Sequence, residues 1–368
     1  MRVLVIGTSG MLDNTVLRLF AQSPGHQVFG AVRSSAALAG GSAHPSRHYY
    51  LADRESGAAH PVGKGCSAAC PRQGECACAV LPRRRHRVKK CSFWLQNSDY
   101  VSKHDPFDPV ALARIPLGLQ KVRNFILKRV MLRSMANADL TIFISDHARR
   151  TIEVLTRVDN PVTIPHGINE AFRTHAQTLQ RPAWLPTGEY LLYVSRFDVY
   201  KHQFEVASAF AALPSDLASR YKLLLVGETD EVLVRNVTEL ARNKGLEEQI
   251  LVVGPVAYAD LPAAYHHATV NLFTSSCENC PNILLEALGA GRPVLSSDVM
   301  PMPEFGVDAV GYFSPTDPKS ICDALLRVLR DESHRNELAA AAIRRSADFD
   351  WANTSQKTWQ HITGLVTQ

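Results

Sequence analysis

The second half of the chain alternates short apolar runs with longer segments whose apolar residues recur at helical spacing. The short runs predict buried strands, because successive positions in them are hydrophobic. Six such strands are expected, at Tyr190–Phe197, Lys222–Gly227, Ile250–Gly254, Thr269–Ser275, Pro293–Asp298 and Val310–Ser314. Strands that alternate with helices predict a parallel, doubly wound α/β sheet with helices on both faces. Such sheets bind ligands beyond the carboxyl ends of their strands.

The first half of the chain is less regular. A strand at Arg2–Gly7, a helix from Met11 and a strand at Gln27–Arg33 make one strand–helix–strand start. Further strands are expected near Phe93, at Leu140–Ser145 and at Val162–Ile168. Residues 34–92 show almost no periodicity and are rich in Ala, Gly, Pro, His, Arg and Cys, so we expect them to be irregular. The first domain is therefore expected to be an atypical or incomplete α/β domain.

Composition narrows the class of protein. A chain of 368 residues can form two domains, and 46% hydrophobic with 20% charged residues is typical of a globular protein. No apolar run approaches the roughly 18 residues of a membrane span, and Val3 to Ile6 is too short for the core of a signal peptide. We therefore expect a cytoplasmic protein whose eight cysteines stay reduced. The formal charge of +5 is compatible with anionic substrates and does not require nucleic acid, so no nucleic-acid partner is expected.

The glycine turn GTSGMLD begins like a dinucleotide-binding fingerprint. Gly7 and Gly10 occupy two of its positions, but Asp13 occupies the third, where a carboxylate would repel a bound pyrophosphate. Residues 1–38 resemble the amino terminus of short-chain reductases related to dTDP-4-dehydrorhamnose reductase, and Arg33 would suit the 2′-phosphate of NADP. Those enzymes use a Tyr-x-x-x-Lys pair, and no tyrosine of this chain precedes a lysine at that spacing. An NADP-dependent nucleotide-sugar reductase therefore stays an alternative function with less support.

The stretch SSCENCPNILLEALGAGRPVLSSD contains two glutamates, Glu278 and Glu286, on either side of a predicted helix start. Pro281 is expected to open this helix, which leaves amide N–H groups at its amino end available to an anion. Glu286, about one turn further, could accept hydrogen bonds from two ribose hydroxyls. Glu278, in the loop, could meet a sugar hydroxyl beside the reacting carbon. Two solvated glutamates on a surface helix are the alternative interpretation.

The same stretch resembles the carboxy-terminal signature of glycosyltransferase family 4. That resemblance implies a retaining transferase with the GT-B fold, in which two Rossmann-like domains face a cleft. Over residues 93–366 other segments match the family in order: YVSRFDVYKH, VGE, VVGPV, TIPHGI and FDWANTSQKTWQHI. The implied domains are an acceptor-side domain over 1–170, a nucleotide-sugar-binding domain over 171–348, and a helix over 349–368 that returns to the first domain.

The resemblance also implies roles for individual residues. Arg196 and Lys201 would hold the donor diphosphate and would form the catalytic group together with Glu278. The donor-binding candidates are Glu286, Asn282, Gly254 and Val256, and the acceptor-side candidates are Asn97 and His166. Two cations and helix-terminal amides can stabilise a leaving diphosphate without a metal, so we expect neither a metal nor a cofactor.

The expected function is transfer of a sugar, with retention, from a nucleotide-sugar donor to a glycan or lipid-linked acceptor in cell-surface polysaccharide synthesis. Residues 1–92 do not resemble the first domain of the family, which leaves a nucleotide-sugar-binding protein without turnover as a further alternative. The helix over Leu117–Met135 mixes basic and apolar positions. It could rest on the inner face of a membrane that presents a lipid-linked acceptor, or it could be an ordinary amphipathic helix.

Two other patterns are not interpreted as metal sites. Cys66, Cys70, Cys76 and Cys78 lack the regular paired spacing of zinc ligands. Asp348-Phe349-Asp350 has the Asp-x-Asp form that GT-A enzymes use to hold a divalent ion, but it lies between two predicted helices. We interpret it as a helix junction.

Overall fold

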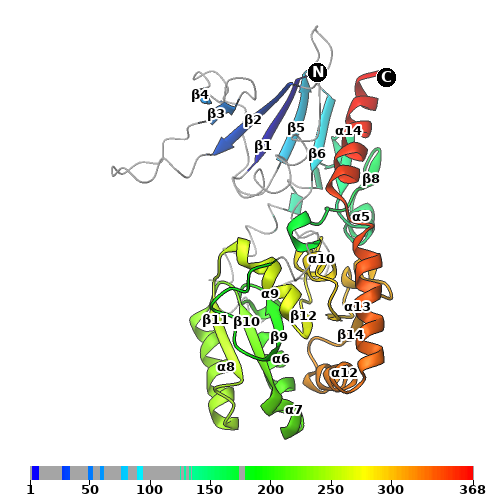
Figure 1. The fold of residues 1–368 in the computed structure, drawn as a ribbon. Coiled ribbons are helices and arrows are strands. Elements are labelled where there is room, and N and C mark those ends of the chain that lie inside the picture. The colour runs from blue at the N-terminus through cyan, green and yellow to red at the C-terminus, as the bar shows by residue number, and fades with distance from the viewer. Residues whose placement is uncertain are drawn as a thin grey trace. The chain divides into compact units, whose positions relative to one another are not determined.

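The fold is described from a computed structural model (Figure 1), in which the chain divides into two compact units. The N-terminal unit combines the strands that precede Gly167 with the C-terminal helix, and the C-terminal unit extends from Gly167 to Asp350. The described residues are 2–7, 27–33, 49–52, 59–61, 76–81, 89–93, helical positions among 125–136, and 135–367 without 174–178. Side chains are described only from residue 125 onwards.

The C-terminal unit is built on a fully parallel sheet. Its strands are β9 (Glu189–Val194), β10 (Tyr221–Val226), β11 (Ile250–Gly254), β12 (Val270–Phe273), β13 (Val294–Ser297) and β14 (Gly311–Phe313). They lie in the order β11-β10-β9-β12-β13-β14. The structure confirms all six predicted strands and shortens most of them, because residues at their carboxyl ends leave the sheet to form loops. Every residue of β12 and β13 is buried, including the polar residues Asn271, Ser296 and Ser297, because both faces of these strands are covered.

Helices follow the strands in turn. They are η4 (Glu170–Arg173), η6 (Val199–Lys201), α6 (Gln203–Ala211), α7 (Ser215–Arg220), α8 (Glu231–Lys244), η7 (Tyr258–Asp260), α9 (Leu261–His267), α10 (Asn282–Gly289), α11 (Met302–Gly306), α12 (Pro318–Arg330) and α13 (Glu332–Ser346). Helix α6 contacts α8 and α12, whereas α10 contacts α9, α11 and α13. Two groups of helices therefore enclose the sheet, as predicted for a doubly wound fold.

The strand order changes direction between β9 and β12. The chain proceeds from β9 outward through β10 to β11, then returns to place β12 on the other side of β9. At such a switch point the loops after the two central strands diverge and leave a crevice in which ligands bind. The segments after β9 and β12 are therefore the first place to look for a functional site.

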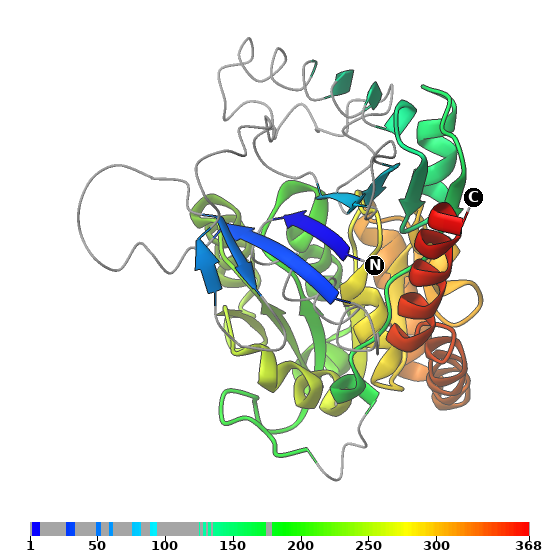
Figure 2. The same cartoon turned by 90° about the horizontal axis from the view of Figure 1, so that it is seen from above.

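The N-terminal unit has a mixed sheet. Its strands are β1 (Arg2–Gly7), β2 (Gln27–Arg33), β3 (Tyr49–Ala52), β4 (Ala59–Pro61), β5 (Cys76–Leu81), β6 (Lys89–Phe93), β7 (Leu140–Phe143) and β8 (Pro161–Thr163), in the order β4-β3-β2-β1-β5-β6-β7-β8. Strands β1 and β2 run side by side and parallel, as predicted (Figure 2). The pairs β6–β7 and β7–β8 are also parallel, whereas β5 is antiparallel to both of its neighbours.

Four strands lie within or overlap residues 34–92, which the sequence pattern predicts to be irregular. Strands β3, β4 and β5 lie inside this interval, and β6 begins at Lys89. They are three to six residues long, and β3, β4 and β5 pair only with antiparallel neighbours. Strands β3, β4 and β5 do not show the sustained alternation of apolar and polar residues that marks a half-buried strand, so pairing with other segments defines them rather than local pattern.

The C-terminal helix belongs to the N-terminal unit. Helix α14 (Trp351–Thr367) packs beside β7 (Figure 2), and its Thr354 Oγ1 donates a hydrogen bond to the Pro165 carbonyl at 2.8 Å. Helix α5 (Asp146–Glu153) lies on the same unit and contributes Ala148 and Ile152 to a small apolar core. Asp348-Phe349-Asp350 separates α13 from α14, which confirms the helix junction.

The amphipathic segment predicted over Leu117–Met135 is described only in part. Its described positions are helical, with Phe125 exposed and Met135 buried, and the Arg129 guanidinium lies 4.6 Å from the Phe125 ring centroid. Within the part of the chain that the structure describes, no helix is both long enough and apolar enough to cross a membrane.

Candidate functional site

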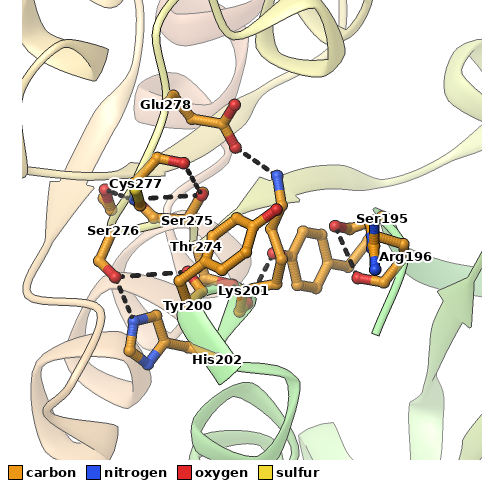
Figure 3. Close-up of polar contacts among 12 residues, drawn as sticks. Ser195, Arg196, Tyr200, Lys201, His202, Thr274, Ser275, Ser276, Cys277 and Glu278 are labelled. Atoms are coloured by element: carbon orange, nitrogen blue, oxygen red, sulfur yellow. Dashed lines mark hydrogen bonds and ion pairs between the residues drawn. The ribbon is translucent and has the colours of Figure 1, made fainter. Parts of the chain in front are cut away.

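The loops after β9 and β12 meet at a buried ion pair between Lys201 and Glu278 (Figure 3). Their side chains are only 6% and 17% exposed. The Lys201 ammonium also lies 5.2 Å from the ring centroids of both Tyr200 and Phe273. Removing an ammonium from water is costly, and here a carboxylate and two aromatic rings offset that cost. A cation and a carboxylate are thus fixed together at the switch point of the sheet.

The backbone of Lys201 is held as firmly as its side chain. Its carbonyl oxygen accepts hydrogen bonds from the Tyr193 hydroxyl at 2.6 Å and from Thr274 Oγ1 at 2.7 Å. Both donors are buried, one in β9 and the other directly after β12. Burial raises the pKa of Tyr193 above its ordinary value, so the phenol stays protonated and keeps its role as donor. The two central strands together therefore position Lys201.

Further hydrogen bonds join the same two loops. The Ser276 amide donates to the Tyr200 carbonyl at 2.9 Å, and His202 Nε2 lies 2.8 Å from Ser276 Oγ (Figure 3). His202 has a φ of +53°, a left-handed conformation that turns the chain from η6 into α6. Asp198 caps η6 by accepting from the Val199 amide at 2.8 Å. These contacts fix the loops relative to each other.

Arg196 lies in the same loop but in a different environment. Its side chain is 61% exposed and forms an ion pair with Asp198 at 3.5 Å. Its carbonyl accepts a hydrogen bond from Gln203 Nε2 at 2.7 Å, so the backbone is anchored while the guanidinium faces solvent. Of the two predicted diphosphate ligands, Lys201 is therefore buried beside Glu278 and Arg196 is exposed.

Glu286 lies in α10, about one turn beyond the first helical residue, Asn282, where the sequence predicts it. Pro281 is the N-cap residue rather than the first helical residue, and it forms no side-chain cap. The hydroxyl of Tyr258 donates to Glu286 Oε1 at 2.9 Å. Asn282 is the first residue of α10 and is exposed.

The remaining predicted residues lie in three different places. Gly254 ends β11 with a φ of +81°, and its carbonyl accepts from the Gly227 amide at 2.9 Å; Val256 follows two residues later and is partly exposed. His166 lies in the N-terminal unit, where its buried ring stacks on Trp351 with centroids 5.4 Å apart. Asn97 lies outside the described residues.

Sequence reasoning missed four residues of this network. Tyr193, Thr274, His202 and Tyr258 each lie at or just beyond the carboxyl end of a strand or beside Lys201. Position relative to strand ends is the signal that could have identified them. Among the residues whose side chains are described, no group of three or more His, Cys, Asp or Glu could hold a metal ion. Cys277 and Cys280, on either side of Glu278 along the chain, are buried and form no disulfide.

Comparison with known proteins indicates the class of protein. Residues 177–345 match the family model described as "Glycosyl transferases group 1". The chain is 27% identical over 259 residues to the serotype-specific mannosyltransferase WbdA of Escherichia coli, a match covering 68% of this chain and 31% of that protein. It is 28% identical over 261 residues to the O-antigen chain mannosyltransferase B of Escherichia coli, covering 68% of each. Anabaena HepE, crystallised with UDP and glucose, superposes with a TM-score of 0.58 at 17% identity, covering 70% of each chain.

The structural likeness, together with the doubly wound parallel sheet, identifies the fold as GT-B. The family match lies almost entirely within the C-terminal unit, which carries Lys201, Glu278 and Glu286. Together these comparisons support a glycosyltransferase with the GT-B fold. The match to WbdA spans about a third of the length of that relative.

Proposed function

We propose that this chain transfers a sugar from a nucleotide-sugar donor to a glycan or lipid-linked acceptor, with retention of configuration, as a member of glycosyltransferase family 4. The observation that carries the proposal is the buried Lys201–Glu278 pair between β9 and β12 of a GT-B donor domain. Ligands of doubly wound sheets bind at the switch point. A nucleotide diphosphate bound there is negatively charged, so a cation at this position would stabilise it.

Lys201 stabilises the leaving group in this proposal. Departure of the sugar leaves additional negative charge on the diphosphate, and a cation in a desolvated site interacts with that charge more strongly than one in water. Glu278 holds the ammonium in place before the donor binds. The exposed Arg196 supplies a second cation that moves from Asp198 onto the diphosphate. No Lewis acid is needed for this step.

Glu278 and Glu286 contact the two ends of the donor. Glu278 meets a hydroxyl of the transferred sugar next to the reacting carbon, while Glu286 accepts hydrogen bonds from the ribose. The amino end of α10 lies between the two carboxylates along the chain, and because no side chain caps it, its amides can bind the diphosphate. Asn282, at the first position of α10, contacts the donor, and the backbone around Gly254 and Val256 contacts the base.

Mannose is the first sugar to test, since two of the relatives are mannosyltransferases. The acceptor binds in the N-terminal unit, and His166 is the described candidate there. Cell-surface polysaccharide synthesis places such a transferase in the cytoplasm. The helical segment around Phe125 and Arg129 would then contact the inner face of the membrane that carries the acceptor.

The test begins with donor binding. Calorimetry with UDP-, GDP- and dTDP-sugars, and with NADPH, should show binding of one nucleotide sugar and none of NADPH. Glu286→Ala should weaken that binding at least tenfold, because each hydrogen bond to a charged acceptor is worth about 1.5–3 kcal/mol. Glu239→Ala, which removes an exposed carboxylate on α8, is the matched control and should bind like the wild type.

The second stage measures chemistry. Transfer to a lipid-linked glycan, with the anomeric configuration of the product determined by NMR, should show retention. Binding of a donor without hydrolysis or transfer would indicate a nucleotide-sugar-binding protein instead. Intact affinity in Glu286→Ala would show that the donor site has been assigned wrongly, and tight NADPH binding would favour a reductase.

A further inference from the structure

Two tyrosines interact with Glu286, one through a hydrogen bond and the other electrostatically. The Tyr258 hydroxyl, from η7, donates to Glu286 Oε1 at 2.9 Å. Tyr265, from α9, is only 1% exposed, and its hydroxyl has no hydrogen-bond partner among the residues that the structure describes. An unpaired buried hydroxyl costs about 1–3 kcal/mol and calls for an explanation, such as a group that arrives with a ligand. The surroundings of Glu286 are therefore those of a built polar site rather than of a solvated helix.

Phe172 fixes both tyrosine rings. It is fully buried in η4, and its ring centroid lies 5.6 Å from that of Tyr258 and 5.6 Å from that of Tyr265, each in an edge-to-face arrangement. The carbonyl of Phe172 lies 3.0 Å from His266 Nε2, which ties η4 to α9. Phe172 thus holds the ring of Tyr258 in place, although Tyr258 itself is 50% exposed.

The pKa of Tyr265 also indicates that its hydroxyl lies near Glu286. Burial raises the pKa of Tyr265 well above its ordinary value, and the negative charge of Glu286 raises it further. The carboxylate and the buried hydroxyl are therefore close enough to interact electrostatically. The same Glu286 side chain thus accepts a hydrogen bond from Tyr258 and interacts electrostatically with Tyr265.

We propose that Tyr258 is a positioning residue for the donor: its hydroxyl fixes the Glu286 carboxylate so that the carboxylate presents its remaining acceptor positions to the ribose hydroxyls. This inference rests on the proposed function. A carboxylate has about four lone-pair positions, and Tyr258 occupies one of them on Oε1. The 2′- and 3′-hydroxyls need only two acceptor positions, and a carboxylate that Tyr258 already holds can accept them without first losing torsional freedom. Tyr258 therefore contributes to the choice of ribonucleotides over deoxyribonucleotides.

The experiment compares a ribonucleotide with its 2′-deoxy analogue. Calorimetry uses UDP and 2′-deoxy-UDP, or GDP and 2′-deoxy-GDP if the donor panel identifies guanine, with wild type and Tyr258→Phe. The wild type should prefer the ribonucleotide. Tyr258→Phe keeps the ring against Phe172 and removes only the hydroxyl, so it should weaken ribonucleotide binding about fivefold to tenfold and narrow the preference. In transfer assays, the KM for the donor should rise by a similar factor, with kcat nearly unchanged.

Tyr312→Phe is the matched control. Tyr312 lies in β14, and its buried hydroxyl also has no hydrogen-bond partner among the described residues. This variant should keep the wild-type affinity for both nucleotides, and both variants should keep the wild-type Tm within about 2 °C.

Four outcomes would overturn the inference. The first is unchanged binding of both nucleotides by Tyr258→Phe. The second is an equal loss for both, which would indicate a structural role. The third is a wild type that binds both nucleotides equally well, which would show that the 2′-hydroxyl makes no contact that contributes to binding, although the protein binds the nucleotide. The fourth is a wild type that binds no nucleotide, in which case the proposed function fails as well.

Discussion

The two sheets of this chain are assembled by different rules. In the C-terminal unit every strand pair is parallel, and each strand lies next to one that is close to it along the chain, except where β9 meets β12. In the N-terminal unit a single antiparallel strand, β5, separates the parallel pair β1–β2 from β6–β7–β8, and the unit is completed by α14 from the far end of the chain. The exception between β9 and β12 brings Lys201 and Glu278 together, although 77 positions separate them.

That difference shows how topology makes a site. A doubly wound sheet has one switch point, so a ligand site is defined as soon as the strand order is known. A mixed sheet offers no such rule. The predictions that follow test whether the C-terminal unit forms its site by topology and whether the N-terminal unit depends on the helix from the far end of the chain.

The largest effect should come from breaking the ion pair at the switch point. Lys201→Met leaves the Glu278 carboxylate, only 17% exposed, without its partner, which should lower the stability of the C-terminal unit by about 3–5 kcal/mol. Lys201→Met combined with Glu278→Gln removes both charges and should recover most of that stability. The proposed mechanism predicts that both variants lose transfer activity by about a thousandfold, because it assigns the stabilisation of the leaving group to Lys201.

Thermal unfolding and transfer assays check this prediction together. Lys244→Met, which removes an exposed lysine at the end of α8, is the control for loss of positive charge. Equal stability of the single and double variants would mean that the pair is not desolvated as the structure indicates. Full transfer activity in the double variant would exclude Lys201 from the leaving-group step.

A smaller effect should follow from adding a side chain where the segments after β9 and β10 approach each other closely. Gly227 has a φ of +144°, and a Cβ there would lie 2.2 Å from the Ser195 carbonyl oxygen. Gly227→Ala combines backbone strain with a steric clash, so it should cost about 3 kcal/mol or more. Gly188→Ala has strain alone, since its φ is +97° and nothing lies within 4 Å of the position that a Cβ would take. It should cost about 1–2 kcal/mol.

Urea unfolding of the two glycine variants measures both costs. The difference between the two costs is the free energy of the steric clash between the added Cβ at position 227 and the Ser195 carbonyl. If Gly188→Ala proved as destabilising as Gly227→Ala, the clash would add nothing to the cost of the backbone strain.

The sequence predicts the two units unequally for the same physical reason. Buried parallel strands such as β10 and β13 are recognisable because both of their faces are covered, and the helix start at Pro281 and the position of Glu286 follow from local rules. The Tyr258–Glu286 contact joins residues 28 positions apart, and no local pattern encodes it. Strands β3 to β5 are likewise defined by pairing across the sheet rather than by their own residues.

A third prediction concerns the attachment of α14. Thr354 Oγ1 donates to the Pro165 carbonyl, so Thr354→Val removes one hydrogen bond between α14 and the rest of the N-terminal unit. We expect a loss of about 1 kcal/mol, confined to that unit, measured by hydrogen exchange of β7 amides. Thr363→Val is the control, because its hydroxyl donates within α14 to the Trp359 carbonyl. Equal effects of the two substitutions would show that the contact with Pro165 does not hold the helix in place.

The smallest effect should appear only at high pH, and it should come from the C-terminal unit alone. Burial raises the pKa of Tyr312, in β14, to about 12, while a tyrosine in an unfolded chain ionises near pH 10. The contribution of the protonated phenol to stability is therefore complete below pH 10 and is lost as the pH rises from 10 to 12. Tyr312→Phe removes this titration, so its free energy of unfolding should fall less steeply between pH 10 and 12 than that of the wild type.

Denaturant unfolding at pH 9, 10 and 11 measures both slopes. At pH 9 the variant should match or slightly exceed the wild type, since the phenol has no hydrogen-bond partner among the described residues. Identical slopes would mean that the Tyr312 hydroxyl reaches solvent in the folded protein, and that β14 is a more open edge of the parallel sheet than the structure shows.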